Sequence, residues 1–119
     1  MTTPRIFLAV AALFGASGVG LLATGSHGGN PLAATAGQML LFHASALMAA
    51  TLAREMGHLH KTIGLAALAI MAASVAIFSA DLAIRTQGWP RLFPMAAPIG
   101  GSLTILSWLI LAAAALRPR

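Results

Sequence analysis

The 119-residue chain is 59% hydrophobic and only 8% charged, which excludes a water-soluble domain, because such domains carry roughly 25% charged residues. Its net charge of +5 comes from seven lysine and arginine residues against two acidic residues. These charges stand singly at the ends of apolar runs, which excludes a nucleic-acid-binding face and is typical of membrane proteins. The chain has no cysteine, so disulfides, thiolate catalysis and iron–sulfur or zinc–thiolate sites are excluded as well.

Four apolar stretches follow one another along the chain, each close to the roughly 20 residues that cross a hydrocarbon core of about 30 Å. They are apolar at odd and even positions alike, so they predict helices and not the alternating strands of a barrel. We therefore expect an all-α, polytopic membrane protein, a single four-helix transmembrane bundle over residues 1–119. The expected spans are about 6–24, 32–53, 62–84 and 95–116.

Polar connections separate these stretches. The turn-forming cluster 25–31 ends the first, and an alternative interpretation of that first stretch is a cleaved signal peptide, although its length favours a retained helix. Segments 54–61 and 85–91 separate the others, and Pro94 and Pro98 are expected in the first turns of the fourth helix, where a missing amide donor costs least.

The basic residues predict the orientation, because cytoplasmic loops are enriched in lysine and arginine. One side of a four-span topology holds five of them, and the other side holds two. We therefore expect both termini in the cytoplasm and Trp89 at the outer membrane interface, where an amphipathic ring is favoured. The five are Arg5, Arg54, Lys61, Arg117 and Arg119, and the two are Arg85 and Arg91.

His43 lies near the middle of the second span. At helical spacing it shares a face with Ala36, Met39, Ala46 and Ala50. Because small residues mark closely packed helices, we expect His43 to point into the bundle or an oligomer interface. It is then a neutral imidazole bonded to a neighbouring helix, or a haem or metal ligand, or a proton relay. A bis-histidine haem would need a second copy of the chain.

Asp81 and Arg85 are four residues apart near the outer end of the third span, in the favourable order for an intrahelical ion pair. The alternative is a ligand or proton site. Ser74, on the face of Asp81, lies level with His43, and the two are expected to hydrogen-bond if the second and third helices pack directly.

The outer half of the bundle is expected to hold a set of polar residues. Two histidines and a carboxylate allow an iron-type facial triad, but no local motif supports one. The set comprises His27, Gln38, His43, Asp81 and Arg85. Small residues are expected where helices pack closely: Gly15, Gly18 and Gly20 in the first span, and Pro98, Gly100 and Gly101 in the fourth.

Motifs at residues 5–16, 25–28, 37–47, 78–82 and 97–102 resemble, in this order, domain-of-unknown-function family 423, the bacterial relatives of transmembrane protein 256. The resemblance implies a four-helix protein of the inner membrane with no established activity. Ser26 departs from the Gly-Ala-His pattern of the family. Ala80-Asp81 stands where many relatives have Gly-Ser, so a family-wide role for Asp81 is not implied.

With loops too short for a soluble active site, we expect a non-enzymatic accessory or assembly subunit of a larger membrane complex, without a cofactor or bound metal. Its partners are lipid and other membrane subunits or itself, and not nucleic acid. One alternative is a small homo-oligomeric transporter or channel that uses the outer-half polar residues. Another is a haem- or metal-binding redox protein with His43 as ligand.

Overall fold

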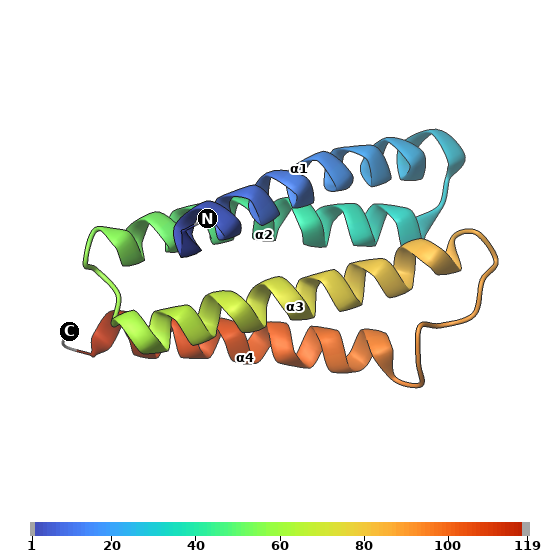
Figure 1. Ribbon diagram of the computed structural model, residues 1–119. Coiled ribbons are helices and arrows are strands. Elements are labelled where there is room, and N and C mark those ends of the chain that lie inside the picture. Colours follow the sequence, from blue (N-terminus) through green and yellow to red (C-terminus); the bar gives the residue numbers. More distant parts are fainter. Residues whose placement is uncertain (1, 118–119) are drawn as a thin grey trace.

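The computed structural model describes residues 2–117 as four helices and their connections (Figure 1). All four are long and apolar enough to cross a membrane, so the predicted all-α, multi-pass membrane fold with four spans is confirmed. Arg119, one of the basic residues that we counted for the orientation, lies outside the described residues. The helices are α1 Thr3–Gly28, α2 Pro31–Glu55, α3 Lys61–Arg85 and α4 Ala96–Leu116.

The first helix continues past the predicted break at Gly25. It ends only at Gly28, because Gly29 takes the left-handed conformation (φ 62°) and donates its backbone N–H to the Gly25 carbonyl. Asn30 then caps α2, its side-chain oxygen accepting from the backbone N–H groups of Leu32 (3.0 Å) and Ala33 (3.3 Å). The connection between α1 and α2 is therefore two residues long.

The fourth helix starts later than its apolar run. Pro94 precedes the helix and does not lie in its first turn, because Met95 adopts a left-handed conformation (φ 68°) that interrupts the chain before Ala96. Pro98 is the third residue of α4, where its missing N–H leaves no broken helical bond. The α3–α4 connection therefore covers residues 86–95.

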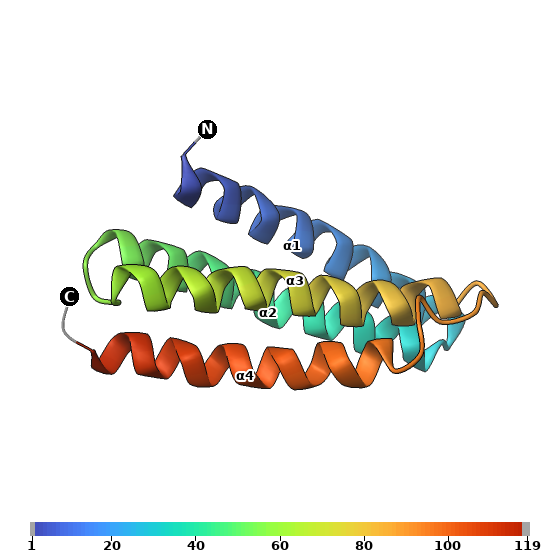
Figure 2. The ribbon, with the colours of Figure 1, turned by 60° about the horizontal axis from the view of Figure 1, so that its bottom comes forward.

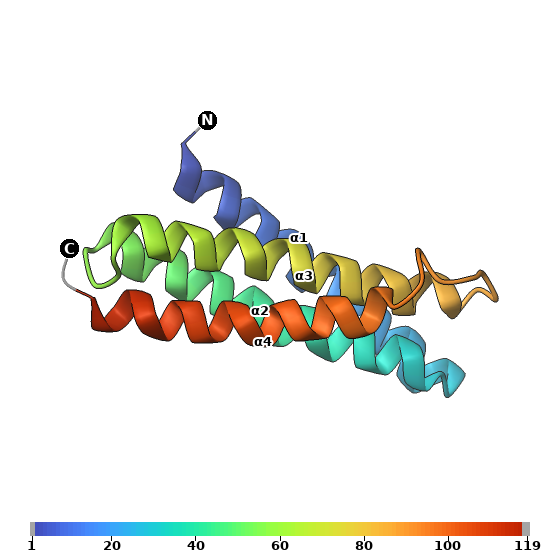
Figure 3. The same ribbon diagram turned by 90° about the horizontal axis from the view of Figure 1, so that it is seen from below.

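The helices lie in chain order, with α2 and α3 in the centre. The α1 helix packs on α2 and α4 packs on α3, so α1 and α4 lie on opposite sides of the central pair (Figures 1 and 2). One end of the bundle, the termini end, holds the connection 56–60 and the start and finish of the chain, and the other, the loop end, holds connections 29–30 and 86–95. The N-terminal half of α1 leans away from the other helices (Figure 3).

Close approach of α1 and α2 depends on glycine. A Cβ atom at Gly37 would lie 2.8 Å from the Gly18 carbonyl oxygen, and one at Gly18 would lie 3.0 Å from the Gly37 carbonyl oxygen. Nearer the loop end, a Cβ at Gly25 would lie 2.9 Å from the backbone nitrogen of Ala34. Backbone therefore packs on backbone along this contact, as small residues permit between membrane helices.

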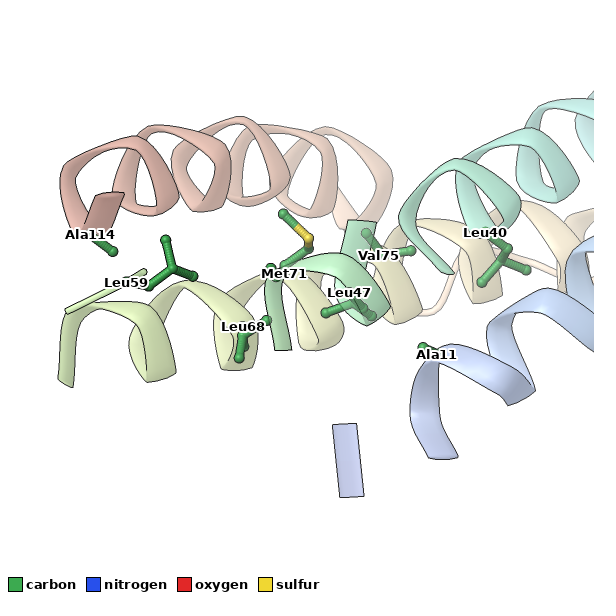
Figure 4. Packing of buried hydrophobic residues seen from close by; sticks show 9 residues of the cluster. Ala11, Leu40, Leu47, Leu59, Leu68, Met71, Val75 and Ala114 are labelled. Carbon is green, nitrogen blue, oxygen red and sulfur yellow. The ribbon is translucent and has the colours of Figure 1, made fainter. Parts of the chain in front are cut away.

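The apolar core lies mainly between α2 and α3. Leu47, Leu68, Met71 and Val75 are fully buried there (Figure 4). At the termini end, the backbone N–H of His60 donates to a carbonyl in the last turn of α4 at 2.9 Å, which joins the 56–60 connection to that helix. The central pair is thus well packed, whereas α1 and α4 each keep a broad exposed side.

Candidate functional site

His43 is buried between α2 and α4, and both of its ring nitrogens have partners within the chain. Nδ1 lies 2.8 Å from the Met39 carbonyl oxygen, and Nε2 lies 3.0 Å from the indole Nε1 of Trp108. A carbonyl only accepts and an indole N–H only donates. His43 is therefore the neutral tautomer with its proton on Nδ1, donating to Met39 and accepting from Trp108.

This pairing has a chemical consequence. The Nε2 lone pair, which would bind a metal or haem iron, accepts the Trp108 hydrogen bond. Protonation of Nε2 would set two N–H groups against each other. The Trp108 ring also stands edge-on to the imidazole, with ring centroids 5.7 Å apart and 63° between the planes. The arrangement joins α2 to α4 and leaves no free imidazole nitrogen.

The expected hydrogen bond between Ser74 and His43 is wrong. The Ser74 hydroxyl instead accepts from the Thr104 hydroxyl of α4 at 2.9 Å and donates to the Met71 carbonyl at 3.3 Å. A Cβ at Gly100 would lie 3.0 Å from the Ser74 carbonyl oxygen, so α4 lies directly on α3 at this level. The physical reason is that α4, and not α3, lies over the His43 ring.

Asp81 is fully buried at the loop end of α3 and has two partners. Its Oδ2 lies 3.4 Å from Nη1 of Arg85, whose side chain is 25% exposed, which is the expected i,i+4 pair. Its Oδ1 accepts the backbone N–H of Leu92 at 2.9 Å. A buried carboxylate needs such partners. Asp81 therefore holds the 86–95 connection against the bundle, a role that the sequence did not suggest.

The other polar residues expected in the outer half do not join a cluster. His27 is exposed in the last turn of α1, and not in a loop, because α1 extends to Gly28. Gln38, expected inside, is exposed on the outer surface of α2. It is five residues from His43, which places it about 140° around the helix. Within residues 2–117, no three histidine, aspartate or glutamate side chains meet as a facial triad requires.

The residues expected at close helix contacts also differ in their surroundings. Gly18 and Gly100 lie at the tight contacts described above, while Gly15 and Gly101 would bring a Cβ only into ordinary contact, at 3.9 Å and 3.7 Å. A Cβ at Gly20 would meet no atom within 4 Å, and Pro98 is exposed. Gly20 therefore lies at no tight helix contact of the described chain, and Pro98 lies on its surface.

Sequence reasoning missed Trp108 as a site residue. Its signal is faint: Thr104, Ser107 and Trp108 share one side of an otherwise apolar helix at spacings of three and four residues. Ser107 donates to the Thr104 carbonyl at 2.6 Å. Thr104 and Trp108 supply polar side-chain contacts of α4 with α3 and α2, whereas the Ser107 bond stays within α4.

Comparison with known proteins places the chain in one family. Residues 14–101, well over half of the chain and including the polar residues discussed above up to Arg85, match the family described as protein of unknown function (DUF423). No curated protein and no solved structure matches the chain. The match agrees with the resemblance of the sequence motifs. The chain therefore belongs to the DUF423 family of proteins of unknown function.

Proposed function

We propose that the chain is a non-catalytic accessory or assembly subunit of a larger membrane complex, and that a partner subunit binds the outward face of α2. The observation that carries this proposal is the exposed side chain of Gln38. Gln38 lies seven residues after the start of α2, about 10 Å along the helix. This depth falls within a hydrocarbon core of roughly 30 Å.

An exposed amide at this depth needs partners. A glutamine side chain offers two donors and a carbonyl acceptor, and no hydrogen bond joins the side chain of Gln38 to any other residue of the described chain. Hydrocarbon supplies no hydrogen bond, and polar side chains between membrane helices hydrogen-bond across the contact. A polar group on a neighbouring helix from another subunit would satisfy Gln38.

The surroundings of Gln38 fit a helix. Phe42, Ser45 and Ala49 follow it at helical spacing and are exposed on the same side of α2. This face, Gln38 to Ala49, borders a groove of about 300 Å³ between α2 and α4. Small side chains dominate the α2 wall of the groove, which allows a further helix to approach closely. The groove is lined by Ala46, Ala49, Ala50, Ala53, Leu59, Trp108 and Leu111.

The two alternative functions have less support. A redox protein with His43 as ligand would have to displace the Trp108 indole from Nε2. A transport pathway would need polar residues along a common route, but His27 and Gln38 point outward from separate helices, and Asp81 is occupied by Arg85 and Leu92. The interior polar groups instead hold the fold together.

The partner face is tested by photo-crosslinking in native membranes. A photoreactive phenylalanine analogue at Phe42, 68% exposed, is expected to give one discrete protein adduct, identified by mass spectrometry. The analogue at Leu109 of α4, 64% exposed, is the matched control and is expected to give lipid adducts only. Gln38→Leu should lower the yield of the Phe42 adduct about tenfold, because it removes one or two interhelical hydrogen bonds. Identical patterns at both positions would refute the proposed face.

We also propose that the termini end faces the cytoplasm of a bacterial inner membrane. Arg5, Arg54, Lys61 and Arg117 lie at this end, against Arg85 and Arg91 at the loop end. Because the chain has no cysteine, single cysteines at the exposed positions Met56 and Gln87 can be labelled without background. A membrane-impermeant thiol reagent added to intact spheroplasts should label Gln87→Cys and spare Met56→Cys; the reverse pattern contradicts the orientation.

A further inference from the structure

The α3 helix exposes one continuous line of small side chains from end to end. Its members recur every three or four residues and therefore share one face. The exposed side of α4, by contrast, carries large groups such as Leu103, Ile105, Leu106 and Leu109, which suit lipid. Small faces in membranes occur where helices pack closely. The α3 line consists of Thr62, Ala66, Ala69, Ala73, Ala76 and Ala80.

A groove beside this line contains an unpaired hydroxyl. The groove, about 370 Å³, lies between α1 and α3 and is lined on α3 by Ala76, Ser79, Ala80 and Ala83. Ser79 is 2% exposed, and its hydroxyl has no hydrogen-bond partner in the part of the chain that the structure describes. Ser17 of α1 also lines the groove, but it makes no hydrogen bond with Ser79. A buried hydroxyl without a partner is costly, and a second chain would supply the missing partner.

The α1 helix carries a matching line. Ala9, Ala12, Ala16, Gly20 and Ala23 are all exposed and lie on the side turned away from α2. A Cβ at Gly20 would meet no atom within 4 Å, so the line is open to a neighbour at this position.

The two lines also agree in direction and register. The α1 and α3 helices run the same way through the bundle (Figure 1). Three pairs of their small residues coincide when the numbering is displaced by sixty: Ala9 with Ala69, Ala16 with Ala76, and Gly20 with Ala80. The N-terminal half of α1 diverges from α4 (Figure 2), and although Ala11 is buried against the core, Ala9, Ala12 and Ala16 remain exposed to a neighbour.

We infer that a second copy of this chain binds here, with α1 of each copy packed on α3 of the other. A two-fold axis along the membrane normal keeps the two helices parallel. It also requires that each copy carry both contacting faces on one surface, and this chain carries them as the α1 line and the α3 line. Ser79 lies beside Ala80, opposite Gly20 of the second copy, where a glycine leaves backbone carbonyls open to accept the hydroxyl.

The dimer does not depend on the proposed partner subunit. Its contact uses α1 and α3, whereas the partner face lies on α2 and the α2–α4 groove. Loss of the dimer therefore leaves the Phe42 adduct in place, and loss of the partner leaves the dimer in place.

Disulfide crosslinking in native membranes tests the contact. Ala16→Cys on a chain with one affinity tag and Ala76→Cys on a chain with another are co-expressed and oxidised; the chain's lack of cysteine removes any background. A disulfide between the two tags is expected at a yield at least about tenfold above that of a control pair. The control replaces Ala76→Cys by Ile105→Cys on α4, a side chain 65% exposed. Equal yields from the two pairs would overturn the dimer.

A second variant separates contact from folding. Gly20→Leu places its side chain in open space in the single chain, so the fold is retained, and the crosslink yield is expected to fall about tenfold. Ala112→Leu, at an exposed position of α4, adds the same bulk and should leave the yield unchanged. A Gly20→Leu chain that crosslinks as well as the parent would overturn the proposed contact.

Discussion

Replacing Gly37 by alanine is expected to force α1 away from α2. The added Cβ would lie 2.8 Å from both the Gly18 carbonyl oxygen and the Leu22 backbone nitrogen, and backbone atoms cannot rotate aside as side-chain ends do. Overpacking of this kind costs about 1–3 kcal/mol. Alanine recovers up to about 1 kcal/mol in helix propensity in water, so we expect a net loss of about 1 kcal/mol, measured by unfolding in mixed detergent micelles.

The matched control is Gly15→Ala on α1. It makes the same chemical change, but the new Cβ would lie 3.9 Å from the Cβ of Ala44, at ordinary contact distance. We expect Gly15→Ala to leave the free energy of unfolding unchanged or slightly raised. Equal effects of the two substitutions would mean that Gly18 and Gly37 do not set the close approach of α1 and α2.

His43→Ala is expected to destabilise the bundle by about 3 kcal/mol, because it empties a buried volume and leaves the Trp108 N–H without an acceptor. Trp108→Phe removes the donor and leaves Nε2 unpaired. In a double-mutant cycle, the two substitutions should couple by about 1 kcal/mol, the usual strength of one hydrogen bond between membrane helices.

The contrary result is equally specific. If His43 served as a ligand or proton carrier and not as a helix contact, His43→Ala would leave the unfolding free energy near that of the parent, and the coupling with Trp108→Phe would vanish. Unfolding of the four chains of the cycle, followed by circular dichroism, distinguishes the two outcomes.

The sequence was sufficient to predict the number and approximate positions of the spans, because uninterrupted apolar runs in lipid have only the helix available. It was less reliable for helix ends. Gly25 and Ser26 are turn formers, yet α1 continues through them, because Gly25 packs against Ala34 and the left-handed turn waits until Gly29. Pro94 was expected in the first turn of the fourth helix, but Met95 is left-handed and α4 begins only at Ala96.

The site shows what a periodic pattern can and cannot specify. The small residues around His43 indicated its inward direction, and the structure places the ring there. For Gln38, the prediction used only its depth along the helix and not the direction in which its side chain leaves the helix axis. The side chain points outward. The Trp108 partner is 65 residues from His43, and the Leu92 partner is 11 residues from Asp81. Both contacts depend on how α4 and its connection are positioned, which no local pattern contains.

The polar interior holds the fold together, and we propose that the outward faces of α2, α1 and α3 bind other chains. Native mass spectrometry of complexes ejected directly from membrane vesicles tests this assignment most directly. We expect the 12.1-kDa chain to appear as two copies together with at least one other polypeptide, and Gln38→Leu to release that polypeptide while the two copies stay together. A parent chain that appears only as a lipid-bound monomer would contradict the account.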